Sequence, residues 1–331
     1  MPVSDRGGYF MKRTLIQPII IVLLAFGLAV APSLAEPSAA SADAASLVST
    51  AWLVKNIGAP NLVVIDVRTD ANYAFAHLPG AVSLPYFTGC KVMNKEKMCR
   101  LMPTPPEFSK MMRSLGVNQS SHVVIYGQGN TISDATQGTS ATWVMEAMGV
   151  ENVSYLDGGF TKWTFEGRKV VKTVPAPQAG NFTAKPDMSK VATLDDVIAN
   201  LKTKKAIFLD ARSPVQHFGA SKEAAVMRFG HIPGSLNFPA PFMSNAGANR
   251  APATIKSSKE LEVMARGVGL PAARARPVIV YCNSAQFAGM GYFVLHDILG
   301  YRNVKVYDGS MLEYAQHNLP LVKFAWGFVT K

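Results

Sequence analysis

The feature of this sequence that most constrains its fold is a set of four short segments that occur twice, in the same order. The segments begin at residues 62, 76, 122 and 153 in the first half and at 206, 230, 277 and 304 in the second. The offsets between matched residues are 144, 154, 155 and 151. Because chance matches do not stay collinear at nearly one offset, we infer a duplicated domain of about 140 residues.

Both copies combine apolar runs with the same few polar residues. The first run ends in Asp-x-Arg, the second segment contains His-x-Pro-Gly, and the last ends in Asp-Gly. The paired segments are Leu62–Arg68 and Ala206–Arg212, Ala76–Val82 and Gly230–Leu236, His122–Tyr126 and Pro277–Tyr281, and Val153–Gly159 and Val304–Ser310. Short apolar runs that alternate with segments of helical period are typical of buried parallel strands joined by helices. The sequence therefore predicts an α/β fold with two tandem domains, each a parallel sheet flanked by helices.

Apolar periodicity and the positions of prolines divide the chain further. Strands are predicted at residues 63–67, 123–126, 207–209 and 278–281, and helices at 47–57, 106–115, 135–148, 194–201, 259–267 and 288–299. Residues 172–190 contain three prolines and little apolar periodicity, which is typical of a linker. This linker separates a first domain, residues 36–171, from a second domain, residues 191–331.

The first 35 residues have the pattern of a secretory signal peptide. Lys12 and Arg13 precede the apolar run Ile19–Val30, and the small residues Ser33 and Ala35 suit cleavage after Ala35. The alternative is a retained membrane anchor, but the apolar run has 12 residues, and a spanning helix needs about 20. We therefore expect a periplasmic or secreted protein with no stable membrane insertion after cleavage.

Charge and cysteine content restrict the function classes. The chain has 33 basic and 22 acidic residues, and residues 36–331 keep 30 and 21, a net charge of +9. No long basic run is interleaved with aromatic residues, so we do not expect a nucleic-acid partner; a basic surface favours small anions. The three cysteines form no Cys-x-x-Cys pair, and His296 has no second ligand three or four residues away on its helix. No metal site is predicted.

Cys282 is the candidate nucleophile. It follows the predicted strand 278–281 and precedes a predicted helix, and in open α/β sheets reactive groups lie beyond the carboxyl ends of the strands. Loop N–H groups and the helix dipole are expected to lower the pKa of a thiol at this place. The alternative is an inert, buried cysteine, which is the commonest fate of a free one.

The other two cysteines suggest why Cys282 is left unpaired. Cys90 and Cys99 lie nine positions apart in a polar, irregular stretch, which suits a local disulfide in an exported protein. A lone thiol that persists in an oxidising compartment is a candidate for catalysis.

Taken together, these motifs resemble the tandem rhodanese-like sulfurtransferases. The resemblance rests on two copies of strand-Asp-x-Arg, His-x-Pro-Gly and Asp-Gly, with a strand-Cys-loop-helix segment at Cys282. It implies that the second domain is catalytic, and that its cysteine takes a sulfane sulfur from a small anionic donor, forms a persulfide and passes the sulfur to cyanide or a thiol. It also implies that the first domain, with Gly127 at the position of Cys282, is catalytically silent. No cofactor is required for this chemistry.

Two other chemistries are disfavoured by spacing. A dinucleotide-binding G-x-G-x-x-G would start at Gly127 and Gly129, but its third glycine falls on Ile132. Phosphatases related to the rhodanese fold need Cys-x5-Arg, because the arginine helps to hold a phosphoryl group, and here Ala288 occupies that position.

Donor recognition is assigned to the loop and to nearby polar residues. The loop residues Asn283, Ser284, Ala285, Gln286 and Phe287 follow Cys282. They match neither the basic loops of members that favour thiosulfate nor the Gly- and Ser/Thr-rich loops of members that favour 3-mercaptopyruvate. We expect Arg212, His217 and Arg228 to contribute to anion binding and Asp210 to support the loop, with His217 making anion binding depend on pH.

Two alternatives to an enzyme remain open at this point. The uncharged loop and the silent first domain are compatible with a persulfide carrier or binding module that delivers sulfur to a partner protein. A purely structural pair of domains with a buried Cys282 is the other alternative.

Overall fold

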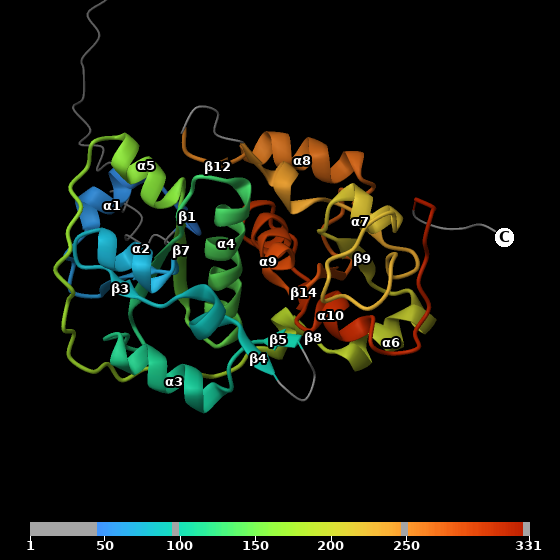
Figure 1. Cartoon of the computed structure of the whole chain (residues 1–331), viewed down its shortest axis with the longest axis horizontal. Coiled ribbons are helices and arrows are strands. Elements are labelled where there is room, and N and C mark those ends of the chain that lie inside the picture. Colours follow the sequence, from blue (N-terminus) through green and yellow to red (C-terminus); the bar gives the residue numbers. More distant parts are fainter. Residues whose placement is uncertain (1–44, 95–98, 246–250, 327–331) are drawn as a thin grey trace, which may run out of the picture. The chain divides into compact units, whose positions relative to one another are not determined.

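Two five-stranded sheets lie in the two halves of the described sequence (Figure 1). This computed structural model describes residues 45–94, 99–245 and 251–326. The predicted signal peptide, residues 1–35, lies outside the described residues. Within the described part of the chain, no helix is long and apolar enough to cross a membrane.

The two sheets have the same strand order. In the first half it is β1 (Leu47–Val48), β7 (Asn152–Leu156), β6 (His122–Tyr126), β2 (Leu62–Asp66) and β3 (Val82–Ser83). In the second half it is β8 (Val191–Ala192), β14 (Val304–Tyr307), β13 (Val278–Tyr281), β9 (Ile207–Asp210) and β10 (Leu236–Asn237). Every neighbouring pair in both sheets is parallel. The predicted fold class, two tandem α/β domains with parallel sheets, is confirmed.

The register of the central strands shows how closely the halves correspond. Asp66 of β2 lies opposite Tyr126 of β6, and Asp210 of β9 lies opposite Tyr281 of β13. The next residue along the chain is Gly127 in the first half and Cys282 in the second. Cys282 therefore lies at the carboxyl end of a central strand, where the connection to the next helix begins.

Helices connect the strands and cover the sheets (Figure 1). The first half contains α1 (Thr50–Asn56), α2 (Asp70–Phe75), the π-helix η1 (Tyr86–Cys90), α3 (Pro105–Ser114), α4 (Ile132–Ala147) and α5 (Gly159–Phe165). The second half contains η2 (Met188–Lys190), α6 (Leu194–Thr203), α7 (Pro214–Phe218), η3 (Ala240–Met243), α8 (Ser258–Gly267), α9 (Gln286–Tyr292), the π-helix η4 (Phe293–Ile298) and α10 (Ser310–Tyr314). Residues 172–187, most of the predicted linker, contain no helix or strand.

Two predicted helices are wrong in part. The helix predicted at 47–57 begins only at Thr50, because Leu47 and Val48 pair with β7 and the Ser49 side chain caps the helix by accepting a hydrogen bond from the Trp52 backbone N–H. The helix predicted at 288–299 starts two residues earlier and changes from an α-helix to a π-helix at Phe293. Strands of two residues are too short to give a periodic signal.

The described residues of the two halves pack together in one compact unit, and α4 lies beside α9 (Figure 1). The approach is close because α9 has a glycine at the contact: a Cβ on Gly289 would lie 2.5 Å from the Ser140 Cα atom. Most of the buried apolar side chains of both halves belong to one continuous cluster that includes this contact.

Short hairpins also link the halves. In the first half, β4 (Val92–Asn94) and β5 (Cys99–Leu101) pair antiparallel, and the backbone N–H of Met102 donates to Oδ2 of Asp308 at 3.0 Å. In the second half, β11 (Ser244–Asn245) pairs with β12 (Thr254–Ile255), and the N–H of Ile255 donates to Oδ1 of Asp157 at 2.9 Å. Each hairpin therefore contacts the aspartate of the repeated Asp-Gly motif in the other half.

Candidate active site

The loop after β13 surrounds the sulfur of Cys282 with backbone N–H groups. Hydrogen bonds from the N–H groups of Ser284, Phe287 and Ala288 favour the thiolate form of Cys282. The loop can turn this tightly because Ala285 has a left-handed backbone conformation, with φ 68°. The sequence thus supplies a cradle of donors for an anionic sulfur, as such strand-to-helix turns do elsewhere.

Burial has the larger effect on the thiol. Cys282 is 3% exposed, and this burial raises the pKa of its thiol above the ordinary value, while the three N–H groups lower the pKa by less. Asp210 adds a smaller effect that also raises the pKa. The prediction that the pKa of Cys282 is lowered is therefore wrong, because sequence position reveals the N–H donors but not the desolvation of the sulfur.

Ser310 holds the Cys282 loop and was missed by the sequence analysis. Its Oγ accepts hydrogen bonds from the backbone N–H groups of Cys282 and Ala285, each at 3.2 Å, and donates to the carbonyl of Tyr307 at 2.8 Å. Ser310 itself is left-handed, with φ 50°. The sequence feature that could have indicated this role is the residue after the repeated Asp-Gly motif, which is Gly159 in the first copy and Ser310 in the second.

The first domain has the same backbone hydrogen bonds at the matching loop, although Gly127 stands there in place of a cysteine. The N–H groups of Phe160 and Thr161 donate to the carbonyls of Gly127 and Gln128. In the second domain, Met311 and Leu312 donate in the same way to Cys282 and Asn283. These backbone hydrogen bonds are thus a property of the fold, and the second copy has a cysteine, Cys282, where the first has Gly127.

Asp210 and Arg212 form a buried ion pair beneath the loop. Nη2 of Arg212 lies 2.7 Å from Oδ2 of Asp210 and also donates to the carbonyl of Gly230 at 2.9 Å. Asp66 and Arg68 repeat this pair at 2.7 Å in the first domain, where Gly127 stands at the position of Cys282. Because the copy without this cysteine keeps the pair, the role shared by both copies is to join the end of a strand to the His-x-Pro-Gly turn.

His217 and Arg228 are both hydrogen-bonded within the second domain. His217 is buried, places Nδ1 3.0 Å from Oδ2 of Asp210, and stacks on the His231 ring with centroids 3.8 Å apart. Arg228 donates through Nε and Nη1 to the carbonyls of Ala315 and Leu319, each at 2.9 Å. Both side chains hold neighbouring parts of the second domain together, and their contribution to anion binding stays a prediction.

The amide side chains of the loop are also engaged. Nδ2 of Asn283 donates to Gln216 at 3.1 Å and to Glu223 at 2.8 Å, while its Oδ1 is buried without a hydrogen-bond partner. Nε2 of Gln286 donates across the domain contact to Oγ1 of Thr136 at 2.7 Å. Of the other loop residues, Ser284 is half-buried and Phe287 packs on the apolar core.

The first domain contacts the Cys282 loop directly. Tyr86 and Ser140 share a hydrogen bond of 2.8 Å, and Oγ of Ser140 lies 3.4 Å from the carbonyl oxygen of Ala285. Lys91, which is fully buried, forms an ion pair with Asp308, two residues before Ser310. The first domain therefore fixes the Cys282 loop from outside, which the sequence of the second domain alone does not predict.

The expected disulfide between Cys90 and Cys99 is absent, since Cys90 is a free, buried thiol. Cys90 is the last residue of η1, whereas Cys99 begins β5 and pairs with Asn94, four residues beyond Cys90. The spacing in the sequence shows neither this change of element nor the register of the hairpin.

Comparison with known proteins decides the family. Residues 49–166 and 193–317 each match the rhodanese-like domain family. The chain belongs to the rhodanese family. A Synechococcus elongatus protein named "Putative thiosulfate sulfurtransferase" is 30% identical, with 96% of this chain and 98% of that protein covered. A Thermus thermophilus protein named "Sulfur carrier protein TtuD" is 32% identical over 85% of this chain and 96% of its own length.

The solved structure of a related protein has the same fold as this rhodanese. SseA from Escherichia coli, described as a 3-mercaptopyruvate sulfotransferase, superposes with a TM-score of 0.68 at 29% identity. The match covers 80% of this chain and 98% of SseA. The predicted enzyme class, a sulfurtransferase, is confirmed by these comparisons.

Proposed function

We propose that this rhodanese moves a sulfane sulfur through a persulfide on Cys282. The donor would be thiosulfate or a related compound such as 3-mercaptopyruvate, and the acceptor cyanide or a thiol. The observation that carries the proposal is the set of three backbone N–H groups, from Ser284, Phe287 and Ala288, that favour the anionic form of the Cys282 sulfur. Donors fixed in this way stabilise negative charge without reorganisation.

With thiosulfate, the reaction has two steps. The Cys282 thiolate attacks the outer sulfur, a new S–S bond forms, and the old S–S bond breaks as sulfite leaves with its electron pair. Cyanide then attacks the terminal sulfur of the persulfide, thiocyanate forms, and the thiolate is regenerated. The charge stays on sulfur atoms held by the same loop throughout, so both steps use the same N–H donors.

A sulfur carrier that serves a partner protein is the second candidate. Its support is the absence of a charged residue among Asn283–Phe287, together with the 3% exposure of Cys282. His217 and Arg228 hydrogen-bond to Asp210 and to the carbonyl of Ala315, so neither side chain is free of partners within the second domain. A carrier would accept sulfur stoichiometrically but would turn over only when its partner opened or completed the site.

We also propose that the protein is exported. The support is the signal-peptide pattern of residues 1–35, with cleavage near Ala35 and a periplasmic or secreted location after it. The intact mass of the protein recovered from the periplasm or medium of an expressing cell tests this directly. A chain that keeps residues 1–35 and stays in the cytoplasm would contradict export.

Intact-mass spectrometry tests the sulfur chemistry. The reduced protein is treated with thiosulfate or with 3-mercaptopyruvate, and cyanide is added afterwards. We expect a gain of one sulfur atom that cyanide removes, and no gain in Cys282→Ser. Cys90→Ser is the matched control, since it removes the other described thiol, also buried and free, and should load sulfur normally.

The same experiment separates the two candidates. Continuous thiocyanate formation identifies an enzyme, whereas one sulfur per chain without turnover identifies a carrier. Loading that survives in Cys282→Ser would refute both.

A further inference from the structure

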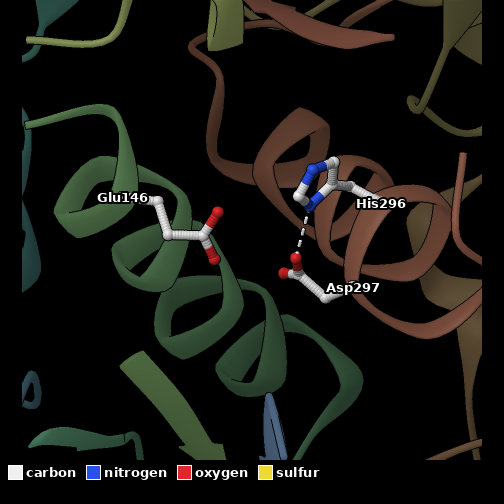
Figure 2. A group of neighbouring side chains, drawn as sticks. All are labelled: Glu146, His296 and Asp297. Atoms are coloured by element: carbon white, nitrogen blue, oxygen red, sulfur yellow. Dashed lines mark hydrogen bonds and ion pairs between the residues drawn. The ribbon is translucent and has the colours of Figure 1, made fainter. Parts of the chain in front are cut away.

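A second cluster of reactive side chains lies at the contact between the domains, away from Cys282. It consists of Glu146 at the end of α4 and of His296 and Asp297 in the π-helix η4 (Figure 2). One possible ligand atom from each residue lies within 4.8 Å of the others. His296 has no second ligand three or four residues away on its own helix, and Glu146, which completes the cluster, belongs to the other domain.

One oxygen of Asp297 has no donor within hydrogen-bond geometry in the described part of the chain. The Asp297 side chain is 4% exposed, and its Oδ2 atom is buried there without a hydrogen-bond partner. The other oxygen, Oδ1, lies 2.6 Å from Nδ1 of His296. Figure 2 shows the Asp297 carboxylate and the His296 ring facing the Glu146 carboxylate across a small gap. A buried carboxylate oxygen with no donor is costly, so it points to a missing partner.

The surroundings leave the cluster short of positive charge. Oε2 of Glu146 accepts from the Tyr292 hydroxyl at 2.9 Å and lies 3.4 Å from Nζ of Lys190. Among the described residues, Lys190 is the lysine paired with Glu146, and it also lies 4.0 Å from Oδ2 of Asp187. A bound cation would be attracted to the two carboxyl groups of the cluster.

A cavity gives access to these three side chains. It has a volume of about 440 Å³ and is lined by Glu146, His296, Asp297, Lys190 and Asp187, among others. The His296 side chain is 31% exposed, so one side of the cluster meets solvent. A hydrated ion can therefore enter without unfolding of either domain.

We propose that Glu146, His296 and Asp297 bind a divalent first-row transition cation, with Zn²⁺ as the best fit. One imidazole nitrogen and two carboxylate oxygens are a ligand set that Zn²⁺ accepts, and three protein ligands leave a position for water. Mg²⁺ prefers oxygen ligands and more water, so it should bind more weakly. The cation would join α4 of the first domain to η4 of the second.

Zn²⁺ binding to the untagged protein tests the site. Titration calorimetry at about pH 7.5, where an unperturbed imidazole is neutral, should give one tightly bound Zn²⁺ per chain. Saturating Zn²⁺ should raise the Tm by roughly 3 °C or more, because a ligand of the folded state stabilises it. Mg²⁺ at the same concentration should neither bind tightly nor raise the Tm.

Variants assign the binding to these residues. Asp297→Asn and Glu146→Gln preserve the shape of the side chain but remove the negative charge of a ligand. Each should weaken Zn²⁺ binding roughly a hundredfold, because a ligand contributes more to the affinity than a residue that only orients a ligand. Glu151→Gln is the matched control, since Glu151 lines the same cavity but is not part of the cluster. Zn²⁺ titrations of Cys282→Ser show that the catalytic thiol is not the ligand.

Two results would overturn the metal site. One is the absence of Zn²⁺ binding to the folded wild-type protein, which would mean that a shared proton, not a metal, joins the two carboxyl groups. The other is equal Zn²⁺ affinity in Asp297→Asn and Glu151→Gln, which would place the bound ion on other residues. Circular dichroism of each variant establishes that it is folded before its affinity is compared.

Discussion

At the scale of single residues, the reactivity of Cys282 depends on two opposed effects. The N–H groups of Ser284, Phe287 and Ala288 stabilise the thiolate, but burial favours the neutral thiol more strongly. The loop therefore stabilises negative charge on the sulfur, but only a small fraction of the molecules has Cys282 as a thiolate near neutral pH. If Cys282 forms the proposed persulfide, any change that raises its thiolate fraction should raise the rate of sulfur transfer.

The rate of persulfide formation should consequently rise with pH. Because the pKa of Cys282 is raised above its ordinary value, the thiolate fraction, and with it the rate of sulfur loading from thiosulfate, should increase about tenfold per pH unit between about pH 6 and pH 8. Quenched-flow mass spectrometry measures this rate, and Cys90→Ser should follow the same profile. A rate that levels off below about pH 7 would instead show a lowered pKa, as the sequence position alone suggested.

The residues that could be predicted from sequence are those whose role follows from local position. Cys282 is recognisable because it directly follows an apolar strand, and Gly127 at the matching position follows from the repeat. The hydrogen bonds of His217 and Arg228 to Asp210 and to the carbonyls near residue 315 could not be predicted, because these partners are set by the fold rather than by spacing. Ser310 and Glu146 were missed because each acts on a loop or helix from a distant part of the chain.

At the scale of elements, the helix that follows Cys282 is also the main contact between the domains. Gly289 of α9 lies against Ser140 of α4, where an added Cβ would be 2.4 Å from the Ser140 Oγ atom. On the same helix, Gly291 lies close to Val280 of β13. The sequence predicted a helix in this region, but the change to a π-helix at Phe293 has no signal in the periodicity.

Gly289→Ala should therefore separate the two helices. The added methyl group meets the backbone of Ser140 as well as its side chain, so the structure must shift, and overpacking of this kind costs about 1–3 kcal/mol of unfolding free energy. Urea denaturation measures the loss. Gly267→Ala at the end of α8 is the control, because nothing lies within 4 Å of its added Cβ, and its effect should stay below about 1 kcal/mol. Equal effects of the two changes would contradict close packing at Gly289.

At the scale of the whole molecule, the duplicated sequence produces reciprocal contacts between its two halves. The aspartate of each Asp-Gly motif accepts a backbone hydrogen bond from the hairpin of the other half: Asp308 from Met102, and Asp157 from Ile255. The repeat predicted two similar domains, but the hairpins have few residues and no shared motif, so their docking could not be predicted. The two contacts differ in that Asp308 also forms an ion pair with a buried lysine, Lys91.

Replacement of that lysine tests how strongly the halves are joined. Lys91 and Asp308 form an ion pair with side chains 1% and 13% exposed. Removal of one partner from a buried pair leaves the other charge uncompensated, so Lys91→Met should lower the unfolding free energy by about 3 kcal/mol or more in urea denaturation. Lys162→Met is the matched control: Lys162 pairs with the equivalent Asp157 at 3.5 Å, with side chains 25% and 18% exposed, and its loss should cost at most about 1 kcal/mol. Similar losses in both variants would mean that the backbone bonds to Met102 and Ile255, rather than the buried lysine, hold the hairpins in place.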